Sequence, residues 1–169
     1  MYHKGVAARN PTPPFRTTAF LLSSLGFAVS RAFYRMLEPL ELEPSEFTLL
    51  RAVGASGGEP QNALAERLQI SPSWMVAIVD ELERRELLER RPHTSDRRVR
   101  TLHLTDAGRK LLKQAERKAL QFDRQVIDPL TETEAQQLVE LLQRVATGLD
   151  LQPGQAHAAL RERDYRRLT

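Results

Sequence analysis

Residues 71–91 read SPSWMVAIVDELERRELLERR and carry the strongest fold signal in the chain. Ser71 followed by Pro72 is typical of a helix start, because Ser caps free N–H groups and Pro suits the first helical position. Four apolar residues at i, i+3, i+4 and i+7 predict a helix face that packs on the core: Met75, Ile78, Val79 and Leu82. The helical pattern ends near residue 86, and residues 87–91 are a short strand candidate.

The segments on either side extend this pattern. Apolar residues at three- and four-residue spacings predict a helix from residue 17 or 18 until Pro39 closes it, and further helices at 44–54, 61–68, 105–128 and 131–149. Residues 100–104 alternate as a second strand, and the polar residues 92–98 between the two strands predict a hairpin with a charged tip.

This order of elements predicts a mainly α fold with a small β-hairpin wing. Two short helices at an angle followed by a hairpin form a winged helix-turn-helix, in which the second helix enters the major groove. We assign 44–104 to this DNA-binding region and 17–40 with 105–152 to a long-helix dimerisation region. Residues 1–16 are expected to be a flexible tail, and 153–169 a C-terminal extension with a short helix.

Composition excludes several classes of function. The 169 residues contain no cysteine, which removes disulfides, thiol chemistry and cysteine zinc sites. The four histidines, at positions 3, 93, 103 and 157, lack metal-ligand spacing, so no metal is expected. No nucleophile–base pair or glycine-rich phosphate loop is apparent, so we expect no enzyme activity and no cofactor. No apolar run approaches the roughly 18 residues of a membrane span, and we expect a cytoplasmic protein.

The positive charge is concentrated in one segment. Residues 84–100 contain seven arginines and three acidic residues, a net charge of +4, whereas the whole chain carries +3. A local basic cluster is the expected footprint of phosphate binding. A solvated basic face without a partner is the other interpretation.

Four motifs resemble a known family. LAxxLxISPS (64–73), VDxLERRxLLxR (79–90), DRR (96–98) and LxLTxxG (102–108) closely resemble the MarR family of bacterial transcriptional regulators, over about residues 17–149. The resemblance implies a homodimer in which each subunit supplies a winged helix-turn-helix. It further implies binding to near-palindromic duplex DNA, usually as a repressor, and release by a small aromatic or phenolic ligand.

The helix that the family uses to read bases departs from the family pattern here. The candidate DNA-contacting residues are Ser71, Ser73, Trp74, Val76 and Ala77, and the last three stand where the family often has Thr, Ser or Arg. Three interpretations remain open. The apolar residues contact thymine methyls and sugars, Trp74 packs in the core, or specific DNA binding has been lost.

The hairpin tip carries the wing residues. By resemblance an Arg of the wing enters the minor groove, where narrow A·T tracts attract guanidinium groups. We predict that Arg97 faces DNA and that Arg98 pairs with Asp96, and the two roles can be exchanged. His93 and Thr94 are candidate phosphate contacts.

Three further positions bear on the DNA surface. Gln61 and Asn62 open the third helix, where they either contact a phosphate or serve as ordinary caps. Glu86 stands where the family commonly has a Gly that ends the helix in a left-handed conformation. We expect Glu there to alter the helix end or to shift the wing.

The long helices predict partners. Their apolar stripes exceed what the small head can cover, so pairing with a second copy is expected. Candidate residues for an aromatic-ligand pocket are Phe27, Phe33, Tyr34, Phe47, Arg51 and Met75, although most aromatic residues at helical spacing belong to a core. The rival function is a winged helix that binds proteins through Trp74, Val76 and Ala77.

Overall fold

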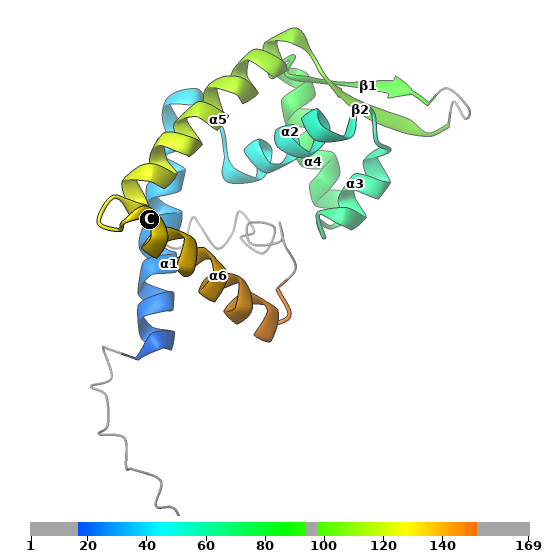
Figure 1. The fold of residues 1–169 in the computed structure, drawn as a ribbon. Helices are drawn as coiled ribbons and strands as arrows, with labels where there is room; N and C mark the ends of the chain where they lie inside the picture. The colour runs from blue at the N-terminus through cyan, green and yellow to red at the C-terminus, as the bar shows by residue number, and fades with distance from the viewer. Residues whose placement is uncertain (1–16, 94–97, 152–169) are drawn as a thin grey trace, which may run out of the picture.

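Six α-helices, one 3-10 helix and one hairpin form residues 17–93 and 98–151, the part of the chain described by the computed structural model (Figure 1). Their bounds are α1 Thr18–Leu37, η2 Glu38–Leu40, α2 Pro44–Ser56, α3 Gln61–Arg67, α4 Pro72–Arg84, β1 Leu88–Pro92, β2 Arg100–Leu104, α5 Asp106–Ile127 and α6 Glu132–Gly148. The predicted mainly α fold with a small hairpin wing is confirmed.

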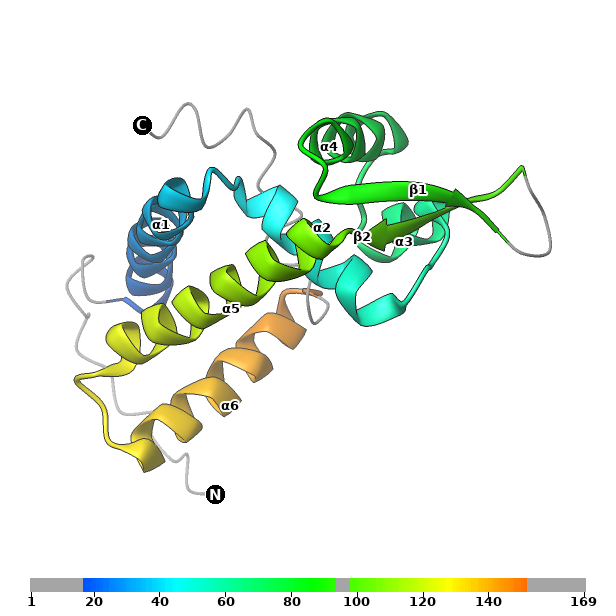
Figure 2. The ribbon, with the colours of Figure 1, turned by 90° about the horizontal axis from the view of Figure 1, so that it is seen from above.

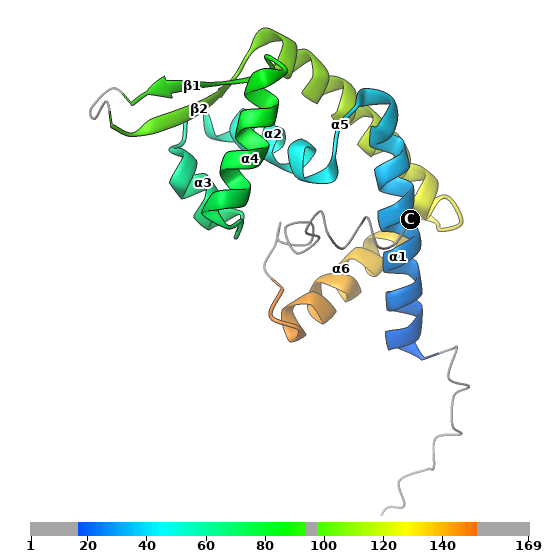
Figure 3. The same ribbon diagram turned by 180° about the vertical axis from the view of Figure 1, so that it is seen from behind.

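The head of the molecule consists of α2, α3, α4 and the hairpin (Figures 1 and 3). The strands are antiparallel, with Leu88 opposite Leu104 and Pro92 opposite Arg100. Seen from above, the hairpin projects from the head on the side away from α1 (Figure 2). The predicted tail and C-terminal extension lie outside the described residues.

One hydrophobic core holds the head together. The largest side chains that are fully buried come from six different elements, namely Leu37, Leu49, Leu50, Leu64, Met75, Val79, Leu82, Leu88 and Leu102. The predicted inner face of α4 is confirmed, since Met75, Ile78, Val79 and Leu82 are all buried. Because α4 contributes a whole face to this core, the orientation of its outer face is fixed relative to the wing.

The LxLTxxG motif forms the junction between β2 and α5. The Thr105 hydroxyl accepts from the Gly108 N–H at 3.0 Å and donates to the Glu86 carbonyl at 2.6 Å. A Cβ on Gly108 would lie 1.9 Å from the Leu87 carbonyl oxygen, so no other residue fits there without backbone movement. The motif therefore packs the start of α5 against the chain that leads into β1.

Glu86 shows how the helix end differs from the expectation. It adopts φ +55°, the left-handed conformation that Gly favours, and α4 ends at Arg84 rather than near residue 86. Strand β1 begins at Leu88, one residue later than predicted. The expected change in the helix end is wrong, because Glu86 reproduces the glycine-like conformation despite its side chain.

The long helices extend away from the head. In Figure 1, α5 leads from the head to a turn near α1, and α6 leads away from that turn in a different direction. Among the residues described, α6 has no buried side chain. No helix in the described part of the chain combines the length and the apolar character that crossing a membrane requires.

Candidate nucleic-acid interface

The outer face of α4 lies beside the wing and faces away from the core. Ser71 caps the helix, because its Oγ accepts from the Trp74 N–H at 3.4 Å. Ser73, Val76 and Ala77 are exposed, as is Ser71. Four of the five predicted recognition residues thus share an accessible surface at the start of α4, the part of a recognition helix that reaches base edges.

Trp74, the fifth predicted residue, is partly buried and packs against the hydrophobic core. This contact favours the interpretation in which Trp74 is a packing residue. Val76, its neighbour but one, is 43% exposed. The three apolar recognition candidates therefore separate into Trp74, which packs on the core, and Val76 and Ala77, which are exposed.

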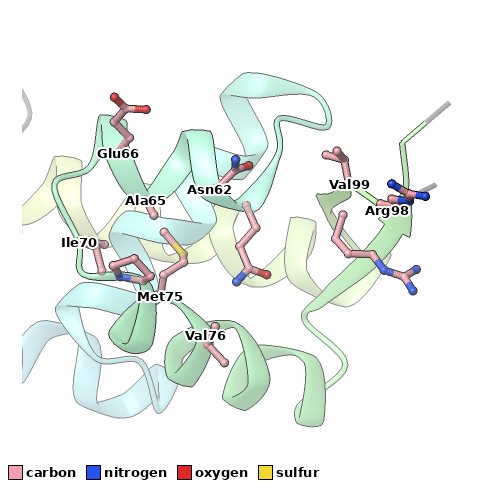
Figure 4. Close-up of a pocket in the computed structure, with 11 residues that line it drawn as sticks. Asn62, Ala65, Glu66, Ile70, Met75, Val76, Arg98 and Val99 are labelled. Carbon is pink, nitrogen blue, oxygen red and sulfur yellow. The ribbon is translucent and has the colours of Figure 1, made fainter. Parts of the chain in front are cut away.

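A cavity of about 530 Å³ separates α3 and α4 from the base of the wing (Figure 4). It is lined by Gln61, Asn62, Ala65, Glu66, Ile70, Pro72, Met75, Val76, Arg98, Val99 and Arg100. The structure thus brings together both predicted residues of α3, Val76 of α4 and Arg98 of the wing. The Met75 side chain is directed toward Ala65 of α3, and that of Val76 is directed away from it (Figure 4).

Arg90 of β1 joins three elements around this surface. Its guanidinium donates to Gln61 Oε1 at 3.0 Å, to Asp80 Oδ1 at 2.6 Å and to the Glu83 carboxylate. Its backbone N–H also donates to Glu83 at 3.1 Å. Gln61 is therefore engaged by the wing rather than pointing freely at a phosphate, and Asn62 is the exposed member of the predicted pair.

The sequence analysis placed Arg90 in the basic segment and at the end of the VDxLERRxLLxR motif, but it did not predict that Arg90 lies at the centre of this cluster. The available signal was the pair of acidic residues, Asp80 and Glu83, which lie one helical turn apart on α4. Such a pair on a recognition helix indicates that a cation from a neighbouring element will bind there.

Four arginines of the basic segment form ion pairs with acidic residues of α2, of α4 or of the segment itself. Arg85 lies 3.2 Å from Glu46 of α2, and Arg84 lies 2.6 Å from Glu81 of α4. Arg91 pairs with Glu89 on its own strand, and Arg90 is held as described. The net charge of +4 counted along residues 84–100 therefore overstates the positive electrostatic potential at this surface. Arg98 and Arg100 lie at the wing end of the cavity.

The wing tip is only partly described. Thr94, Asp96 and Arg97 lie outside the described residues, as does the predicted pairing of Asp96 with Arg98. Below the tip, the His93 N–H donates to the Val99 carbonyl at 2.9 Å and extends the hairpin. Arg98 is exposed. The described part of the hairpin therefore extends past both strands to His93 and Val99.

Burial raises the pKa of the Glu46 carboxyl above its ordinary value of 4.5. The Glu43 N–H, which donates to Glu46 at 2.9 Å, and the Arg85 guanidinium both act to lower this pKa, and they only partly offset the loss of water. Glu46 and Arg85 join the start of α2 to the end of α4.

The predicted ligand residues do not form one group. The Phe33 ring of α1 lies 5.8 Å from the Phe47 ring of α2, and the Arg51 guanidinium lies 5.7 Å from the Phe47 ring centre. The Tyr34 hydroxyl donates to Glu43 at 3.2 Å, and Phe27 is 42% exposed on α1. Met75 belongs to a different place, because it lines the cavity beneath α3.

Phe122 of α5 was missed by the sequence reasoning. Its ring lies 5.9 Å from that of Phe33, and it lines a second cavity, of about 390 Å³, between α1 and α5 with Arg35 and Lys118. Its place on the apolar stripe of α5 was visible, but its contact with α1 depends on a fold-level pairing. In the described residues no group of side chains is suited to hold a metal ion.

Comparisons with known proteins agree with this geometry. The sequence profile described as "MarR family" matches residues 42–99. The chain is 31% identical over 105 residues to the uncharacterized HTH-type transcriptional regulator YpoP of Bacillus subtilis, covering 62% of this chain and 74% of that protein. It is also 31% identical over 105 residues to the HTH-type transcriptional regulator MhqR of Bacillus subtilis, covering 62% and 72%.

Solved structures show the same arrangement. The transcriptional repressor CouR, bound to a 23-mer DNA duplex, is 30% identical, with a TM-score of 0.69 over 77% of this chain and 92% of that one. A point mutant of MarR from E. coli shares the fold at 21% identity, with a TM-score of 0.67 over 80% and 98%. These relatives are named as transcriptional regulators rather than as enzymes.

Proposed function

This chain belongs to the MarR family of DNA-binding transcriptional regulators, and from that premise we propose that it is a homodimeric repressor of a near-palindromic operator. In this proposal the outer face of α4 enters the major groove, the wing tip reaches the minor groove, and a small aromatic or phenolic acid releases the complex. The observation that carries the proposal is the accessible surface that α4 and the base of the wing form together (Figure 4).

The exposed apolar surface supports the proposed dimer. Among the described residues, every exposed large hydrophobic side chain except Val76 lies on α1, α5, α6 or the segments next to them. Extended apolar surface of this kind marks an interface, and a second copy related by two-fold symmetry would cover it. Two-fold symmetry would also place two α4 helices on successive turns of one face of the duplex.

We propose that the wing contributes Arg97 and Arg98, with His93 and Thr94 on phosphates and Asp96 holding the tip. On α3, Asn62 is the better candidate for a phosphate contact, since Gln61 accepts from Arg90. On α4, Ser71 and Ser73 flank Val76 and Ala77 at the groove.

The proposed ligand is an aromatic acid bound near Phe33, Phe47 and Arg51. The Arg51 guanidinium above the Phe47 ring offers a cation to a carboxylate, and the rings offer an apolar wall. Adding 4-hydroxybenzoate or salicylate should weaken DNA binding, and Arg51→Gln should lose that response while it keeps DNA affinity. A response that persists in Arg51→Gln would remove Arg51 from the ligand site.

A titration with a random-sequence 30-base-pair duplex at several salt concentrations tests the DNA surface. The logarithm of affinity should fall steeply with the logarithm of salt concentration, and Arg97→Ala, which removes one arginine from each of the two wings of the dimer, should reduce the slope by about 2. The matched control is Arg124→Ala near the far end of α5, which should leave the slope unchanged. Flat or undetectable binding would contradict the proposal and favour a protein-binding winged helix.

A further inference from the structure

The exposed side chains of α4 form one stripe down its outer face. This stripe comprises Ser73, Val76, Ala77, Asp80 and Arg84, at three- and four-residue spacings. The side chains at its centre, Val76 and Ala77, consist of carbon alone. Val76 is also the only large hydrophobic side chain that is exposed in the described part of residues 44–104.

The polar side chains around this centre are bonded within the protein. Ser71 Oγ caps the helix and lies 3.4 Å from Ser73 Oγ. Asp80 is held by Arg90 at 2.6 Å, and the Arg84 guanidinium bonds both oxygens of Glu81, at 2.9 and 2.6 Å. The middle of the face therefore carries no donor or acceptor for the hydrogen-bond pattern of a base pair.

The major groove presents one apolar feature, the C5 methyl group of thymine, and small apolar side chains contact it directly. Resting on the proposed function, we infer that Val76 and Ala77 select the operator by contacting thymine methyl groups in each half-site. Two methyl-bearing neighbours on one helical turn can contact thymines of adjacent base pairs, and a cytosine at either position would expose its amino group to carbon.

In this proposal, the two DNA-contacting elements, α4 and the wing, have different roles. The α4 face would set the thymine positions, and the wing in the minor groove would respond to groove width. The methyl group of thymine lies in the major groove, so removing it leaves the groups that a minor-groove arginine contacts unchanged.

Deoxyuridine in place of thymidine tests this directly, because it pairs identically and lacks only the methyl group. A duplex is first selected with the full chain from a random library. It is then made with deoxyuridine throughout, only in the half-site centres, or only in the flanks. We expect roughly fourfold weaker binding for each methyl that is read, the effect of burying one group of that size. The flank substitution should have no effect.

Two variants assign the effect to the outer face of α4. Val76→Ala, which keeps the helix because Ala is the best helix former, should bind the thymidine duplex more weakly and lose the part of the deoxyuridine sensitivity that Val76 contributes, while the part due to Ala77 remains. Ser73→Ala on the same stripe should keep the full sensitivity. Each affinity is measured beside a thermal melt of the variant.

The outcomes separate the inference from the function on which it rests. If the wild-type chain binds the thymidine duplex and the fully deoxyuridine-substituted duplex equally, the methyl contact is overturned. The proposed DNA-binding repressor would remain. Full sensitivity retained in Val76→Ala would overturn the assignment to Val76. A library that yields no selected sequence would overturn both the inference and the proposed function.

Discussion

Glu46 on α2 is the only buried acidic side chain in the described residues, and its surroundings set the sign of its pH effect. The charged groups that act on it are Arg85, Glu43 and Glu81. Loss of water outweighs the attraction of Arg85, so the folded protein holds the Glu46 proton more tightly than the unfolded chain does.

Glu46→Gln should therefore change the pH dependence of stability in a defined direction. Because the pKa of Glu46 is raised on folding, its stabilising contribution is complete below about pH 4.5 and is lost as pH rises through the folded pKa. In urea unfolding, the wild-type free energy minus that of Glu46→Gln should fall with rising pH in this window and then level off.

Glu134→Gln on α6 serves as the control of opposite sign. Hydrogen bonds from the Thr131 backbone and hydroxyl lower the pKa of Glu134. Its contribution is present above the unfolded value and is lost as pH falls through the folded one. A wild-type minus Glu46→Gln difference that rises with pH would show that Arg85, not burial, dominates at Glu46.

Glu86 offers a second test at a single residue. Its side chain is exposed, and its backbone N–H and carbonyl bond to Glu83 and Thr105, contacts that Gly retains. Glu86→Gly should raise the free energy of unfolding by roughly 0.5–1 kcal/mol, because Gly tolerates φ +55° without strain.

Gln69→Gly, also at positive φ, should give a similar gain in chemical denaturation. Glu66→Gly, inside α3, should instead lower stability by about 1 kcal/mol. Destabilisation by Glu86→Gly would mean that its side chain supports the turn between α4 and β1.

Among the elements, Arg90 determines how α4 sits against the wing. Arg90→Lys replaces a planar fork with a single ammonium, which cannot reach Gln61, Asp80 and Glu83 together. We expect a loss of about 1–2 kcal/mol in stability, the contribution of hydrogen bonds to charged groups. DNA affinity should fall at every salt concentration with the same salt slope, because Arg90 is engaged within the protein rather than by a phosphate.

Arg91→Lys is the matched control, since Arg91 is exposed and forms its ion pair with Glu89 of its own strand. It should leave stability nearly unchanged. A reduced salt slope in Arg90→Lys would instead identify Arg90 as a phosphate contact.

The elements also show how far the sequence predicts the structure. Periodicity located all six α-helices and both strands, and it identified the buried face of α4, because these signals are local. The contact of Arg85 with Glu46 joins residues 39 apart, and that of Arg90 with Gln61 joins residues 29 apart. Such pairs follow from packing, so the sequence alone indicated the basic segment and not its partners.

At the scale of the whole molecule, most of the exposed large hydrophobic side chains in the described residues lie on the long helices α1, α5 and α6. Leu138, Leu142 and Val145 lie on one face of α6 and are all exposed. Leu138→Glu with Leu142→Glu should prevent pairing, because the carboxylates would have to lose water in an apolar interface. Sedimentation equilibrium should give about twice 19.3 kDa for the wild type and 19.3 kDa for the variant.

Gln143→Glu with Thr147→Glu adds the same charge at the same spacing on the polar face of α6 and should leave the dimer intact. The monomeric variant should also lose affinity for a selected duplex while its head stays folded by circular dichroism. A wild-type chain that sediments as a monomer at micromolar concentration would contradict the proposed assembly.

Selection of bound sequences from a random duplex library by the full chain tests the central claim most directly. Two α4 helices related by two-fold symmetry should enrich an inverted repeat with half-site centres about 10 base pairs apart, and with thymines at those centres. Enrichment of a single asymmetric site, or of no sequence, would contradict a symmetric dimer that reads the major groove through α4.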